Sequence, residues 1–117
     1  MRIELLYFSS CPAYQTALKH LEEVIKEKGL DVGVEMIKIE SDEQALKNRF
    51  LGSPTIRING VDIELGAQKI DEFSIRCRLY LEDGAVKEWP GKKLIRQAID
   101  VALLEQKGLK GGLQNGN

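Results

Sequence analysis

The first thirty residues combine a short apolar run with a stretch of helical spacing. Residues 2–8, RIELLYF, are too few for a lone helix, and their unbroken apolar centre predicts a strand covered on both faces. Over residues 12–28 apolar side chains recur every three or four positions, which predicts an amphipathic helix packed on a sheet. Pro12 suits its first position and Gly29 its end, because proline needs no N–H partner there and glycine accepts the left-handed cap.

The same pattern repeats once more along the chain. Residues 31–40, DVGVEMIKIE, predict a second strand. Ser41 and Gln44 match a capping box, which predicts a second helix over 42–51. A strand, a helix and a strand in this order predict parallel pairing through a right-handed crossover.

The second half changes to strands that alternate apolar and polar positions. Two such runs in residues 55–65 are joined by Asn59-Gly60, which is typical of a tight hairpin turn. Residues 66–89 predict a further hairpin-like segment, and residues 91–106 a last helix. The predicted fold is therefore α/β, in the order β-α-β-α-β-β-α, with a mixed sheet and an extra segment before the last helix.

Length and charge limit the organisation and the classes of partner. The 117 residues are enough for one domain, which we place at 1–107, and the glycine-rich residues 108–117 predict a flexible tail. Seventeen basic and eighteen acidic residues leave a net charge of −1, which argues against nucleic-acid binding and against a membrane surface as the main partner. The chain lacks both an apolar run of about 20 residues and a secretory signal pattern, so we expect it in the reducing cytoplasm.

Cys11, one of two cysteines, lies where the first strand passes into the first helix. Backbone N–H groups in the first turn of a helix lack partners and stabilise an anion, so we expect the pKa of the Cys11 thiol to be lowered. An accessible thiolate there would suit thiol–disulfide exchange. The plain alternative is a small, inert buried residue.

A second motif, GSPT at residues 52–55, lies between the second helix and the third strand. Together with the position of Cys11, it resembles the thioredoxin-like superfamily, whose three-layer fold carries a cis-proline at this junction. The resemblance implies that Pro54 is cis and faces Cys11. Such a loop would present the Ser53 backbone to an extended substrate, so we expect Ser53, Pro54 and Thr55, together with Ser10 and Pro12, to bind substrate. Ser10 could supply a hydrogen-bond donor, or it could merely end the strand.

The match departs from that superfamily at the active-site motif. Residues 11–14 read Cys-Pro-Ala-Tyr, so Tyr14 replaces the resolving cysteine of Cys-x-x-Cys. Tyr14 could donate a hydrogen bond to a Cys11 thiolate, or it could merely pack beneath it. More narrowly, the chain resembles small prokaryotic thioredoxin/glutaredoxin-like proteins, some of which carry an alkylmercury lyase label.

Cys77, in SIRCRLY, leaves two alternatives open. It is either a buried strand cysteine or the resolving partner of Cys11, which needs the two Cα atoms within about 7 Å. Because side chains alternate along a strand, Arg76 and Arg78 should point away from the face that Cys77 occupies.

These residues support three hypotheses about function. The first is a thiol-disulfide oxidoreductase that uses Cys11 as the nucleophile on a protein or small-molecule thiol or disulfide. No bound cofactor is expected, and glutathione is one candidate co-substrate. The second is a non-catalytic binding module of the same fold, and the third is a protein that handles heavy metals or organomercurials with Cys11 and Cys77.

The remaining candidate residues are weaker. We expect no resident metal site, because two cysteines and the single histidine, His20, have no ligand spacing. Arg49 and Arg57, with Lys47, could form a basic rim for an acidic thiol, or they could be ordinary solvated surface.

Overall fold

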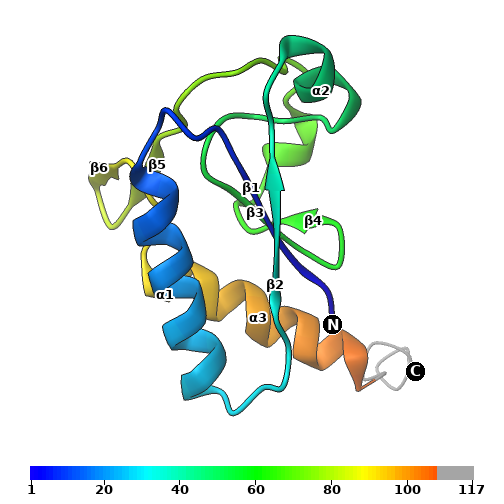
Figure 1. The fold of residues 1–117 in the computed structure, drawn as a ribbon. Helices are drawn as coiled ribbons and strands as arrows, with labels where there is room; N and C mark the ends of the chain where they lie inside the picture. The colour runs from blue at the N-terminus through cyan, green and yellow to red at the C-terminus, as the bar shows by residue number, and fades with distance from the viewer. Residues whose placement is uncertain (108–117) are drawn as a thin grey trace.

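A mixed four-stranded sheet lies at the centre of the computed structural model, which describes residues 1–107 (Figure 1). The strands run in the order β2-β1-β3-β4, and β5 and β6 form a separate two-stranded sheet. The elements are β1 (Ile3–Tyr7), α1 (Ala13–Glu27), β2 (Val34–Lys38), α2 (Asp42–Lys47), β3 (Thr55–Ile58), β4 (Val61–Asp62), the 3-10 turn η1 (Ala67–Lys69), β5 (Tyr80–Glu82), β6 (Ala85–Lys87) and α3 (Lys92–Gln106).

The central strand β1 confirms the predicted two-sided burial. It pairs in parallel with β2 and antiparallel with β3, so the strand–helix–strand prediction holds. Leu5 and Leu6 are both fully buried on opposite faces of the sheet, because successive side chains of a strand alternate. An unbroken apolar run therefore marks a strand with protein on each side.

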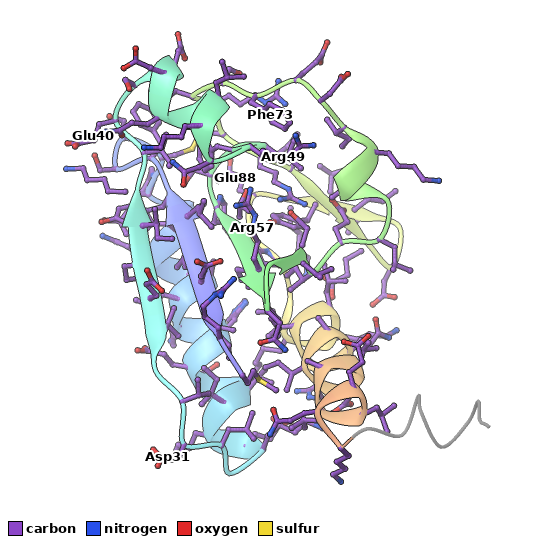
Figure 2. All side chains as sticks on the ribbon, turned by 90° about the vertical axis from the view of Figure 1, so that its right-hand side faces the viewer. Asp31, Glu40, Arg49, Arg57, Phe73 and Glu88 are labelled. Carbon is purple, nitrogen blue, oxygen red and sulfur yellow. A yellow bond between two sulfur atoms is a disulfide. The ribbon has the colours of Figure 1, made fainter. Side chains whose placement is uncertain are left out.

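Helices α1 and α3 cover one face of the sheet, and Figure 2 shows α1 behind the strands. Their apolar stripes meet β1 and β3 in the larger core, as the helical spacing predicted. Its buried members are Ile3, Leu5, Ala17, Leu21, Val24, Ile25, Ile56, Ile58, Ile63, Ile95, Ile99 and Ala102.

The opposite face is covered by α2 and the residues that follow it. Leu6, Ile39, Ala45 and Phe50 form this smaller core. The predicted helix over 42–51 is too long, because α2 ends at Lys47 and the chain turns through a left-handed residue before Phe50. That turn brings Phe50 under the sheet and leaves the apolar side chain of Leu46 65% exposed.

Both hairpin predictions are confirmed. Asn59 and Gly60 have φ of 54° and 83°, and Asp83 and Gly84 have φ of 53° and 79°, so both pairs fit the turn that matches strand twist. The second hairpin, β5–β6, lies in the predicted extra segment 66–89, which also contains η1.

The architecture is a mixed α/β fold, compatible with a thioredoxin-like arrangement. Within residues 1–107, no helix has the length and apolar character to cross a bilayer. The predicted tail, 108–117, lies outside the described residues.

Candidate functional site

Cys11 lies in the tight connection between β1 and α1. Its N–H donates to the Phe8 carbonyl at 3.0 Å, which turns the chain as it leaves the sheet. Pro12 then caps α1 with φ −66° and offers no side-chain acceptor. No side chain therefore caps the backbone N–H groups of the first turn of α1. These N–H groups can stabilise an anion, such as a thiolate, at this position.

The Ser53–Pro54 peptide bond is cis, as the resemblance implied. Two contacts fix this loop beside the end of β1. The Phe8 N–H donates to Ser53 Oγ at 3.0 Å, and the Tyr80 hydroxyl donates to the Pro54 carbonyl at 2.6 Å. Ser53, Thr55 and Tyr80 are all fully buried, so the loop is held from both sides.

The segment that carries Cys77 lies directly against this loop. The Ser53 N–H donates to the Arg76 carbonyl and the Arg78 N–H donates to the Ser53 carbonyl, each at 2.8 Å, in a parallel bridge. The Ser53 backbone was expected to be presented to an extended substrate. That expectation is wrong in this state, because the protein's own chain occupies both groups.

A disulfide joins Cys11 to Cys77, with their Cα atoms 6.0 Å apart. The spacing requirement for a resolving pair is therefore met, and the interpretation of Cys77 as a buried strand cysteine is wrong. Cys77 is exposed, whereas Cys11 is 5% exposed. The accessible thiol expected at Cys11 is thus covered in the disulfide form.

Alternation along residues 77–81 explains this exposure. Cys77, Leu79 and Leu81 are exposed, while Arg78 and Tyr80 are buried between them. The prediction that Arg78 points away from the face of Cys77 is confirmed, whereas Arg76, for which the same was predicted, is exposed like Cys77.

Arg78 supports the site through contacts that could not be read from its position in the sequence. Its guanidinium contacts Asp62 at 2.7 Å, Glu64 at 3.0 Å and Thr55 Oγ1 at 3.1 Å. It also lies 4.5 Å from the ring centre of Tyr80. Burial raises the pKa of the Tyr80 hydroxyl, which stays protonated and donates to Pro54. The one sequence feature that indicated this role is that Arg78 follows a cysteine in a run of alternating side chains, which places the arginine on the inner face.

Of the other residues predicted for the site, some are packed in the interior and others are exposed to solvent. Tyr14 stacks on Tyr7 with ring centres 4.4 Å apart, so the geometry supports packing for its ring. Ser10 and Pro12 are exposed beside Cys11, and Thr55 is buried and donates to the Gly52 carbonyl at 2.6 Å. Thr55 is therefore a support of the loop, not a surface that meets substrate.

His20 lies apart from the cysteines, with Nδ1 3.0 Å from the Pro90 carbonyl. Within the described part of the chain, no group of three or more His, Cys, Asp or Glu side chains could hold a metal ion.

Residues 9–99 match the model of one protein family, described as a domain of unknown function (DUF2703). The chain belongs to this family. The matched span includes both cysteines and the cis-proline loop, so the whole candidate site is part of the family domain. Comparison with curated proteins and with solved structures finds no match.

Proposed function

We propose that this DUF2703 protein is a thiol–disulfide redox protein in which Cys11 and Cys77 alternate between a disulfide and a dithiol. The observation that carries the proposal is the convergence of the two cysteines, 66 positions apart, at an uncapped helix N-terminus beside a cis-proline loop. In a reducing compartment, the location expected from the sequence, a disulfide is more often one that opens and closes than a permanent brace.

Because Cys77 is exposed and Cys11 is buried, we infer which sulfur is attacked first. An external thiolate, RS⁻, attacks Sγ of the exposed Cys77, so that the Cys77–S–S–R bond forms and the Cys11–Cys77 bond breaks. The bonding electrons leave with Cys11 as a thiolate. A second RS⁻ then attacks the sulfur of R in the mixed disulfide, releasing RSSR and the Cys77 thiolate. The protein gains two electrons, and one RSSR forms from two thiols.

Cys11 is suited to be the leaving sulfur in the first step. Its thiolate forms at the N-terminus of α1, where first-turn amides stabilise negative charge, and a stabilised thiolate leaves faster. Attack at Cys11 would require entry to a site only 5% exposed. The proposal therefore reverses the expected roles, making Cys77 the partner-facing sulfur and Cys11 the resolving one.

A redox titration tests the function. We expect the wild-type chain in graded glutathione buffers, acid-quenched and alkylated, to shift between species with no alkyl group and species with two. Cys11→Ser and Cys77→Ser should each remove this two-electron transition. A disulfide that stays closed at every glutathione ratio under native conditions would contradict the proposed function.

A separate experiment tests the order of attack. The oxidised protein is mixed briefly with glutathione, and thiols are trapped with N-ethylmaleimide before peptide mapping. We expect glutathione on Cys77 and maleimide on Cys11, by at least about tenfold over the reverse. The reverse distribution would overturn the assigned roles and leave the redox function standing.

A second candidate, the heavy-metal-handling hypothesis, is favoured by the same convergence. Two thiolates whose Cα atoms lie 6.0 Å apart could bind a soft cation between two sulfurs once the disulfide is reduced. Titration of the reduced protein with Hg²⁺ should then saturate at one ion per two thiols. Cys77→Ser should abolish that endpoint, and equal binding by the variant would rule out the shared site.

A further inference from the structure

A pocket of about 140 Å³ lies on the α2 side of the sheet, away from α1 and α3. Two arginines contribute to it, Arg49 from the turn after α2 and Arg57 from β3, and the Phe73 ring forms part of its wall. Figure 2 labels these three side chains on the same side of the molecule. The remaining lining includes Leu51, Asp62 and Ile70.

The two arginines differ from most others in the described chain because neither forms an ion pair there. Arg2, Arg78 and Arg96 each pair with a carboxylate of residues 1–107, whereas Arg49 and Arg57 do not. Asp62 lines the same pocket, but Arg78 binds both its oxygens and the Glu64 N–H donates to one of them. Glu4 lies opposite Arg57 in the strand register and pairs instead with Arg2 at 3.7 Å.

Arg57 is half-buried, and this burial lowers the pKa of its guanidinium, although Asp62 and Glu4 act in the other direction. Both carboxylates lie opposite Arg57 in the strand register but form their ion pairs with other arginines. The half-buried guanidinium of Arg57 therefore still has donors available for an anionic acceptor.

The backbone holds the two guanidinium groups in one place. Arg57 Nη2 donates to the Arg49 carbonyl at 2.8 Å, and Arg49 has a φ of 53°, which is uncommon for a residue with a side chain. The Arg49 guanidinium lies 4.8 Å from the centre of the Phe73 ring. Stacking orients this side chain at low entropic cost, so the pocket is arranged before any ligand arrives.

We propose that the Arg49–Arg57 pocket binds a small organic anion, with a carboxylate or phosphate between the two guanidinium groups and an apolar body against Leu51, Ile70 and Phe73. Guanidinium groups donate in a fork that fits the oxygens of both anions. The apolar walls favour a ligand with a hydrocarbon part over an inorganic ion. This site is independent of the proposed redox function, because none of its lining residues is a cysteine.

The test is a titration of the oxidised protein, followed by amide NMR shifts at constant ionic strength. The probes are benzoate, inorganic phosphate and uncharged benzamide. We expect saturable shifts with benzoate around Gly60 and Phe73, weaker binding of phosphate, and no saturation with benzamide. Shifts that grow linearly with every probe would overturn the proposal.

Matched variants separate this pocket from general surface charge. Arg49→Gln should weaken benzoate binding at least about tenfold, because one charge-assisted contact is lost. Lys47→Gln makes the same change of charge two residues earlier, outside the pocket lining, and should leave the affinity unchanged. Equal weakening by both variants, or no weakening by Arg49→Gln, would show that the pocket does not hold the anion.

Discussion

Tyr80 shows how a single side chain supports the loop opposite Cys11. Its ring is fully buried and its hydroxyl donates to the Pro54 carbonyl at 2.6 Å. We expect Tyr80→Phe to lower the free energy of unfolding by about 1–3 kcal/mol, because the carbonyl loses its partner in a dry site. Urea unfolding measures the change. Tyr14→Phe is the control, since Tyr14 is half-buried and its ring stacks on Tyr7, while its hydroxyl forms no hydrogen bond with the side chains and backbone that the structure describes. An equal loss in both variants would contradict this role for Tyr80.

Alkaline pH provides a second test of the same residue. Burial raises the pKa of Tyr80 in the folded protein, so its contribution to stability is complete below the unfolded value of about 10 and is lost as pH rises beyond it. Between about pH 9 and about pH 11, the free energy of unfolding should therefore fall more steeply in the wild type than in Tyr80→Phe. If the free energy of unfolding changed with pH in the same way in both proteins, the Tyr80 hydroxyl would ionise equally in the folded and the unfolded chain. Lysine titration is common to both proteins and cancels in the comparison.

At the scale of elements, Gly52 allows the Cys77 segment to approach the cis-proline loop. Its φ is 124°, and a Cβ built there would lie 2.9 Å from Arg78 Cβ and 3.3 Å from the Arg76 carbonyl. We expect Gly52→Ala to cost about 2–3 kcal/mol and to shift the redox equilibrium towards the dithiol. Urea unfolding and the glutathione titration measure the two effects. Gly33→Ala is the control, because a Cβ there meets open space and the backbone is not left-handed. It should change the free energy of unfolding by no more than about 0.5 kcal/mol, and a similar cost at both positions would argue against the close approach at Gly52.

The elements that local patterns determine were predictable from the sequence. The strands, the long helices and both hairpin turns follow from spacing and turn residues within a few positions of one another. The early end of α2 was not predictable, because it depends on Phe50 reaching the smaller core beneath Leu6. The cysteine pair was left as one of two alternatives for the same reason: segment 76–78 is placed by Ser53, more than twenty residues away along the chain. The Arg49–Arg57 pocket likewise needs a strand, a turn and a distant loop, so the sequence offered only basic residues without their arrangement.

For the whole molecule, the disulfide links the connection between β1 and α1 to the start of the last third of the chain. Because the cysteines are 66 positions apart, the cross-link removes many conformations of the unfolded chain and should contribute about 4 kcal/mol to stability. We expect the midpoint of urea unfolding to fall when a phosphine reductant is added. Cys11→Ser/Cys77→Ser should unfold at the reduced midpoint in both conditions. A midpoint unaffected by reduction in the wild type would show that the cross-link constrains the unfolded chain little.

The same cross-link also determines what happens when the backbone is cut. Lys69 is exposed in the stretch between β4 and Cys77, and trypsin cleavage after it divides β1 to β4 from the β5–β6 hairpin and α3. In the oxidised protein these two pieces stay covalently joined through sulfur, and they migrate as one species on a non-reducing gel. Once the thiols are reduced, only non-covalent contacts join the pieces, and a denaturing gel separates them.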